Sequence, residues 1–152
     1  MDCQPKVRYF QREMAGASSR QIVFRLPLRE DSDVAQARFC VRELCARHGF
    51  SSNAVEALAT AASEVARNVI VHAGDGEILL GTEHEAKRLG VVVIARDDGP
   101  GIPNIEDAMR DGFSTRSGLG LGLPSAQRLV HEFELRSSAA EGTIVTLIMW
   151  SK

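Results

Sequence analysis

A long alanine-rich segment, residues 53–72, constrains the fold of this chain most strongly. It is predicted to be one helix because alanine is the best helix former. Asn53 and the serines before it can cap its start, with Glu56 in the capping-box position, and the glycines at 74 and 76 can end it. Its many small side chains predict close packing against a sheet. The β-branched block at 91–94 predicts a well-buried strand of such a sheet.

The rest of the pattern predicts further strands and helices around this pair. Residues 21–28 alternate Ile22, Phe24 and Leu26 with polar positions, which is typical of a half-buried strand, and Pro27 places that strand at a sheet edge. The other expected elements are a helix from Asp31 or Ser32 to about His48, strands at 77–82 and 89–97 around a turn at 84–87, helices at 105–111 and 124–132, and strands at 133–138 and 143–150.

The order of these elements predicts an α/β two-layer sandwich with helices on one face of a mixed, largely antiparallel sheet. A doubly wound fold is disfavoured because strict alternation of strand, helix and strand is missing. With 152 residues, of which 44% are hydrophobic, the chain is expected to build one core in a single domain over residues 21–152. Residues 1–20 show no sustained period and are expected to be an N-terminal arm or lead-in.

Charge and hydropathy argue against several classes of partner and site. The formal net charge of −2 builds no broad basic field, so neither nucleic acid nor a membrane surface is an expected partner. No apolar run approaches the roughly 20 residues of a membrane span, and the first residues lack the apolar core of a signal peptide, so a cytoplasmic protein is expected. Cys3, Cys40 and Cys45 have no CxxC spacing, which argues against a disulfide framework and a zinc site.

Three polar residues lie four apart on the long predicted helix. Successive members of the set Glu64, Asn68 and His72 are rotated by only about 40°, so all three can face one cleft. The Asn68 amide offers a neutral oxygen to a magnesium ion that is otherwise bound by phosphates and water. The Glu64 carboxylate, one turn earlier, can take a proton from an attacking hydroxyl. A solvated polar helix face is the alternative interpretation, and His72 is expected only to pack beside the pocket.

A glycine-rich run, 97–101, begins where the buried strand ends. Asp97 is therefore carried to the rim of the sheet by a rigid element, and its carboxylate can accept a hydrogen bond from an exocyclic amine such as that of adenine. Gly99 and Gly101 allow the backbone to pass close to a ring. Taken alone, such a run is more often a simple turn.

A second glycine-rich run stands just before the predicted helix at 124–132. Gly118, Gly120 and Gly122 can expose amide groups toward a phosphate chain, although a flexible glycine hinge is the alternative. No GKS or GKT follows, so the run is not a Walker A loop. The residues just before it could order over the phosphates as a small lid, and loop polarity explains them equally well; they are Ser114, Thr115 and Arg116.

These motifs, in this order, resemble the N, G1, G2 and G3 boxes of the GHKL ATPases over about residues 21–150. They are Glu64-x3-Asn68-x3-His72, Asp97-x-Gly99-x-Gly101, Gly118-x-Gly120-x-Gly122 and Gly142-Thr143. Within that superfamily the chain is most similar to the anti-sigma-factor serine kinases, in particular the RsbT-type switch kinases of stressosomes. One departure is Asp98, which stands where many relatives carry asparagine.

The resemblance implies a role for each matching residue. Asn68 would ligate Mg²⁺, Asp97 would bind the adenine of ATP with Thr143 nearby, and Glu64 would be the base toward a protein serine or threonine. The base pocket would be shaped by Gly99, Gly101 and Ile102, and the phosphates would meet the backbone of Gly118, Leu119, Gly120, Leu121 and Gly122. Family membership would make the partner a STAS-domain antagonist or scaffold protein, followed by a downstream phosphatase or sigma-regulatory protein.

Two functional hypotheses follow from these residues. The first is an ATP-dependent protein serine/threonine kinase that acts as a regulatory switch. The second is a nucleotide-gated binding module, in which ATP orders a loop for a partner with little or no phosphotransfer. Glu64 discriminates between them, because a pure binding module has no use for a carboxylate there. The catalytic half of a histidine kinase is a weaker third hypothesis, since no dimerising helical hairpin with a phosphoacceptor histidine is found in the 152 residues.

Overall fold

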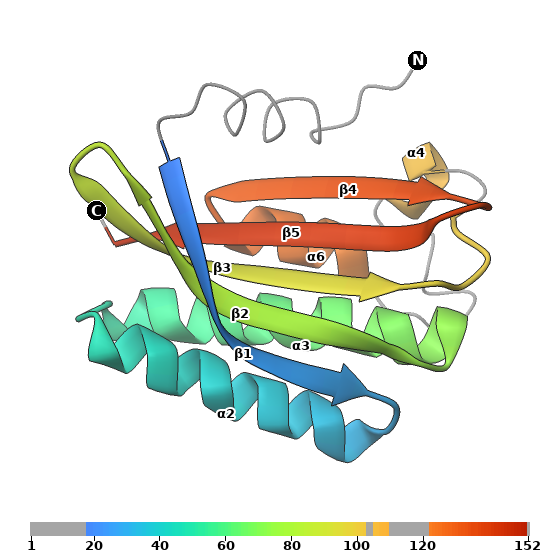
Figure 1. The fold of residues 1–152 in the computed structure, drawn as a ribbon, viewed down its shortest axis with the longest axis horizontal. Coiled ribbons are helices and arrows are strands. Elements are labelled where there is room, and N and C mark those ends of the chain that lie inside the picture. The colour runs from blue at the N-terminus through green and yellow to red at the C-terminus, as the bar shows by residue number, and fades with distance from the viewer. Residues whose placement is uncertain (1–17, 103–104, 110–121, 152) are drawn as a thin grey trace.

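The structure is a computed structural model that describes residues 18–102, 105–109 and 122–151, and its described elements form two layers (Figure 1). In chain order they are β1 (Ser18–Leu28), α2 (Asp31–Arg47), α3 (Ser52–Ala73), β2 (Gly76–Glu85), β3 (Arg88–Asp97), α4 (Ile105–Ala108), α6 (Gly122–Leu129), β4 (Glu132–Ser138) and β5 (Gly142–Trp150).

The five strands form one sheet in the order β1-β2-β3-β5-β4, and all four pairings between them are antiparallel. Helices α2, α3 and α6 cover one face of this sheet (Figure 1). The predicted two-layer α/β sandwich is therefore confirmed, with no parallel pair among the described strands. β5 reaches the centre by pairing with β3, and this places the end of β3 opposite the start of β5.

The core lies between the helices and the sheet. α3 crosses the sheet with a row of small side chains that are completely buried, as its alanine content predicts: Ala59, Ala61, Ala62 and Ala66. From the sheet, alternate residues of each strand point at the helices, as the period of two requires; they include Ile78, Leu80, Val91, Val93, Val145 and Leu147. Cys40 and Cys45 of α2 are buried in the same core, so both act as small apolar side chains.

The starts of the two long helices differ from the prediction. α2 is capped by Glu30 rather than by Asp31 or Ser32, and the backbone N–H of Glu30 donates to the Asp33 carboxylate at 3.1 Å. This contact closes a reciprocal capping box, which lets glutamate take a position that shorter polar residues usually hold.

For α3, Ser51 is the N-cap, and its hydroxyl accepts from the N–H of Ala54 at 3.2 Å. The predicted capping box of Asn53 and Glu56 is wrong, because the Glu56 carboxylate instead accepts from the Arg42 guanidinium at 2.9 and 3.2 Å. This tertiary contact ties the start of α3 to α2.

The strand pattern holds with one displacement in β1. The register with β2 shifts between Ile22 and Phe24, which indicates a β-bulge. Because of this shift Ile22 is 41% exposed, whereas Phe24 and Leu26 are partly buried against the core as predicted. β1 lies at the edge of the sheet, where Pro27 costs no ladder hydrogen bond.

The second half of the chain has shorter helices than expected. α4 ends at Ala108, and α6 ends at Leu129, shortly before β4 begins at Glu132. The Nδ1 of His131, just before β4, accepts from the backbone N–H of Trp150 at 2.9 Å and so holds the end of β5. His84 lies in β2 rather than in the turn, which narrows to residues 86–87 between the two strands.

Candidate functional site

Two of the three predicted helix residues meet the end of the sheet at a small cavity of about 20 Å³. Asn68 and His72 line it from α3, and Asp97 and Thr143 line it from β3 and β5. Its other walls are apolar and come from Val65, Val69, Ala95, Ile102, Leu123 and Val145. The cavity has room for about one water molecule. The helix amide of Asn68 and the acidic strand end at Asp97 thus line one small cavity.

Glu64 lies one turn before Asn68 but does not line this cavity. Its side chain is 27% exposed, and its Oε1 lies 3.9 Å from Nη1 of Arg67, a distance too long for a hydrogen bond. The carboxylate is therefore reachable from solvent and is not held by this neighbour.

Asp97 is fixed by its own turn and by the sheet. Its Oδ1 accepts from the N–H of Gly99 at 2.8 Å, so this oxygen already has a partner. Asp97 is the register partner of Thr143 across the β3–β5 pairing. A Cβ on Gly142, whose φ is 81°, would overlap the Asp97 carbonyl oxygen. Only glycine fits at position 142, and its presence brings the β4–β5 turn against the acidic strand end.

The loop after β3 docks on the end of β4. The N–H of Ile102 donates to the Ser137 hydroxyl at 2.7 Å, and that hydroxyl lies 2.9 Å from the Thr143 hydroxyl. A Cβ on Gly101 would come within 2.5 Å of the Ser138 carbonyl oxygen. Sequence reasoning missed Ser137, because it stands in an ordinary strand pattern far from every glycine-rich run.

The second glycine-rich run reaches the site at its last member. A Cβ on Gly122 would lie 3.0 Å from Nδ2 of Asn68, so the backbone at Gly122 lies directly against the predicted metal-binding amide. Gly122 opens α6, which packs on α3. The other predicted residues of this region lie outside the described residues: Ser114, Thr115, Arg116, Gly118, Leu119, Gly120 and Leu121.

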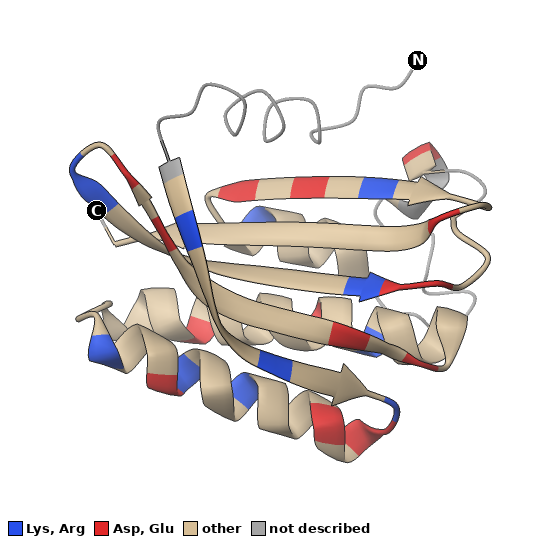
Figure 2. Cartoon of the chain, viewed as in Figure 1, with Lys and Arg blue, Asp and Glu red and all other residues tan. Residues whose placement is uncertain are grey.

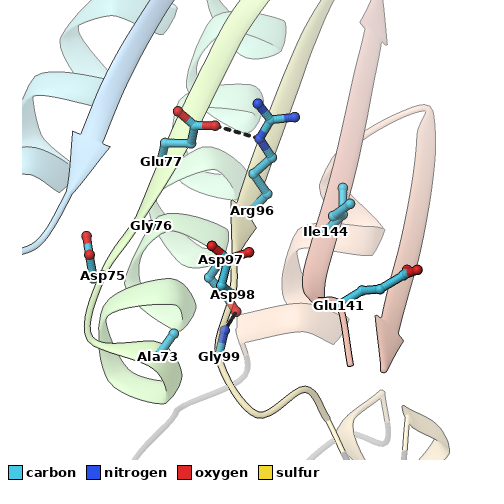
Figure 3. A pocket seen from close by; sticks show the side chains of 10 residues that line it. All are labelled: Ala73, Asp75, Gly76, Glu77, Arg96, Asp97, Asp98, Gly99, Glu141 and Ile144. Atoms are coloured by element: carbon cyan, nitrogen blue, oxygen red, sulfur yellow. Dashed lines mark hydrogen bonds and ion pairs between the residues drawn. The ribbon is translucent and has the colours of Figure 1, made fainter. Parts of the chain in front are cut away.

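A larger cavity of about 700 Å³ lies at the same end of the sheet, between the end of α3 and the strand ends, and it shares Asp97 with the small cavity (Figure 3). Its walls include Glu77, Arg96 and Ile144. The residue next to each of these in sequence faces the helices, so these three side chains point away from the helices. Acidic side chains gather at this end of the sheet (Figure 2), and the lining contains Asp75, Glu77, Asp97, Asp98 and Glu141. The Arg96 Nε donates to Glu77 at 2.6 Å. Asp97 and Gly99, both predicted to contact the base, line this cavity as well, so the two cavities share the acidic strand end. The other carboxylates make the rest of its wall unfavourable for a triphosphate.

A family model described as "Histidine kinase-like ATPase domain" matches residues 26–149, which include every described group of the small cavity. The chain belongs to this family. The histidine kinase-like ATPase domain has a relative in the serine/threonine-protein kinase RsbT of Bacillus subtilis, which is 43% identical over 118 residues, 78% of this chain and 89% of that protein. The anti-sigma F factor of Caldanaerobacter subterraneus is 33% identical over 94 residues, 58% of this chain and 64% of that protein. The resemblance to the GHKL kinases is thus confirmed.

A solved structure titled as the SiaB–SiaC complex from Pseudomonas aeruginosa contains a chain similar to this histidine kinase-like ATPase domain. The match has a TM-score of 0.53 with 10% sequence identity and covers 99% of this chain and 98% of that chain. At this identity the likeness concerns the fold. Among the described residues no helix is both long and apolar enough to cross a bilayer. In the same part of the chain, no three His, Cys, Asp or Glu side chains are grouped as a metal site.

Proposed function

We propose that this protein is an ATP-dependent protein serine/threonine kinase that acts as a regulatory switch. Its substrate would be a STAS-domain antagonist or scaffold protein, after which it would bind a second partner, a phosphatase or a sigma-regulatory protein. One observation carries the proposal: Asn68 and Asp97 line the small cavity together, and Gly122, the last glycine of the second glycine-rich run, lies against Asn68. The relatives named as a serine/threonine-protein kinase and as anti-sigma F factors support a regulatory kinase.

The donor set around the cavity fits an adenine nucleotide. Asp97 keeps one carboxylate oxygen beyond the one that Gly99 occupies, and this oxygen would accept from the adenine amine, with Thr143 beside it. Gly99, Gly101 and Ile102 would shape the base pocket. The phosphates would lie along the backbone of residues 118–122 under Ser114, Thr115 and Arg116. Bound Mg²⁺ would neutralise phosphate charge, and the Asn68 amide oxygen suits it as a hard, neutral ligand.

Binding of the base requires the cavity to open. Its present volume of about 20 Å³ is far below the roughly 300 Å³ at which small-molecule pockets begin. Of its apolar wall residues, Ile102 and Leu123 belong to the loop after β3 and to α6, not to α3 or the central strands. Displacing these two side chains would enlarge the site while leaving Asn68 and Asp97 in place on α3 and β3.

Phosphotransfer would use Glu64 at the edge of the site. The hydroxyl oxygen of the acceptor serine or threonine would form a bond to the γ-phosphorus while the bond to the β–γ bridging oxygen breaks and ADP leaves. Glu64 would accept the hydroxyl proton. Its partly exposed side chain, free of any short contact to Arg67, suits a base that must meet a substrate from another protein.

A transfer assay tests the proposal. Purified protein is incubated with γ-labelled ATP, Mg²⁺ and candidate STAS-domain proteins, and label on the STAS protein is counted. Asn68→Ala is expected to reduce nucleotide binding to its magnesium-free level and to abolish labelling, and Glu64→Gln to abolish labelling with binding retained. Matched controls on exposed positions of the same helix are Asn53→Ala and Glu56→Gln, which should label as the native protein does. Transfer that survives both Glu64→Gln and Asn68→Ala would refute the kinase assignment.

The placement of Glu64 outside the cavity lining favours a second candidate function. In a nucleotide-gated binding module, ATP would order the loop segment for a partner and little or no phosphate would be transferred. This function predicts that Glu64→Gln leaves partner binding intact and that no acceptor is labelled by the native protein. Partner capture that depends on ATP without any labelled product would establish it in place of the kinase.

A further inference from the structure

Ser137 of β4 joins two parts of the small cavity that are distant in sequence. Its hydroxyl accepts from the N–H of Ile102 at 2.7 Å and lies 2.9 Å from the Thr143 hydroxyl. Ile102 and Thr143 both line the cavity, whereas Ser137 does not. Ser137 is thus one layer behind the wall and contacts two wall residues at once.

The direction of the hydrogen bond between the two hydroxyls decides what Thr143 can offer to a ligand. A hydroxyl has one proton and two lone pairs, and one lone pair of Ser137 is already taken by Ile102. If Ser137 donates its proton to Thr143, the Thr143 proton is left for the cavity. In the reverse arrangement Thr143 could offer only a lone pair there.

The chemistry opposite Thr143 favours the first arrangement once an adenine is bound. Asp97, the register partner of Thr143, is an acceptor and would take a proton of the base amine. The ring nitrogen beside that amine is an acceptor in adenine, so the neighbouring protein group must donate. Guanine and hypoxanthine carry a carbonyl where adenine carries the amine, and an N–H on the adjacent ring nitrogen, so they present the opposite pattern.

We propose that Ser137 is a positioning residue for base selection: its hydroxyl ties the loop at Ile102 to β4 and directs the Thr143 proton into the cavity. The inference rests on the proposed nucleotide-binding function. Two close backbone contacts support the same docking, since Gly101 leaves no space for a side chain against Ser138, and Gly142 leaves none against Asp97. Ser137 therefore adds a hydrogen bond to a loop that shape alone already places beside β4.

Ser137→Ala tests the inference, with Ser138→Ala as the matched control. Ser138 precedes the same hairpin turn, is exposed, and its hydroxyl accepts from the Glu141 N–H at 3.0 Å rather than from any group of the cavity. The first measurement is hydrogen exchange of the Ile102 amide in nucleotide-free protein. Ser137→Ala should accelerate exchange by about three- to tenfold, the range of one hydrogen bond, while Ser138→Ala leaves it unchanged.

The second measurement is the dissociation constant for ITP divided by that for ATP. Hypoxanthine, the base of ITP, presents the reversed pattern of hydrogen-bond donors and acceptors. Ser137→Ala should weaken the binding of ATP by about three- to tenfold and the binding of ITP much less, so the ratio falls. Ser137→Thr should restore it. In a Thr143→Val background, Ser137→Ala should change the ratio no further, because the two hydroxyls act through one bond.

An unchanged Ile102 exchange rate and an unchanged ratio in Ser137→Ala, with native protein that binds ATP, would overturn the inference alone. Native protein that binds neither ATP nor ITP would instead overturn the proposed function and the role of Ser137 in base selection. The exchange measurement would then still decide whether Ser137 ties the loop to β4.

Discussion

Gly142→Ala is the substitution whose cost follows most directly from the structure. Two penalties apply at this position: φ is 81°, and the new Cβ would overlap the backbone carbonyl of Asp97. The left-handed conformation costs a non-glycine residue about 1–2 kcal/mol. Overpacking against a backbone that cannot rotate away costs about 1–3 kcal/mol more. We expect Gly142→Ala to lower the free energy of unfolding by about 2–5 kcal/mol.

Gly49→Ala separates the two penalties. Gly49 follows α2 with a φ of 72°, but a Cβ there would meet nothing within 4 Å. It therefore carries the conformational cost alone, and both variants gain equally from a stiffer unfolded chain. Urea unfolding followed by circular dichroism should show Gly142→Ala to be less stable than Gly49→Ala by at least about 1 kcal/mol. Equal unfolding free energies would refute the close approach of Gly142 to Asp97.

Two further predictions concern the core. Leu80 is completely buried between the helices and the sheet, so Leu80→Ala should lower the free energy of unfolding by about 2–5 kcal/mol. Val71→Ala, on the exposed side of α3, should change it by less than about 0.5 kcal/mol. Urea unfolding of both variants checks this. Burial raises the pKa of the Cys45 thiol to about 12 from 9.0, so its contribution to stability is complete below pH 9 and is lost as the pH rises from 9 toward 12. Between pH 8 and about pH 10.5 the free energy of unfolding should thus fall more steeply for native protein than for Cys45→Ala. Parallel curves of this free energy against pH would contradict the prediction.

Local sequence patterns predicted most of the fold because they report burial directly. The alanines of α3 and the block at 91–94 are buried where the periods of helix and strand place them. The pattern failed where a tertiary contact changed a local choice. Glu56 left its expected capping position for Arg42 on the neighbouring helix, and the bulge in β1 turned Ile22 toward solvent.

Some residues of the candidate site could be predicted from the sequence in the same way, and others could not. Asn68 and Asp97 could be predicted because their residue types and their places at a helix stripe and a strand end carry the chemical signal. Ser137 could not, since it meets Ile102 from 35 residues away only because β4 lies beside β5 at the edge of the sheet. The small volume of the cavity was equally hidden, because it depends on how Ile102 and Leu123 pack against the core.

Titration calorimetry with ATP, in the presence and absence of Mg²⁺, tests the central claim most directly. Native protein should bind ATP only weakly without Mg²⁺. Asp97→Asn should lose affinity in both conditions because the amide turns a donor toward the adenine amine, whereas Asn68→Ala should lose only the gain that Mg²⁺ provides. Binding that is indifferent to both substitutions, or no uptake of ATP by the folded native protein, would contradict a single nucleotide site at this cavity.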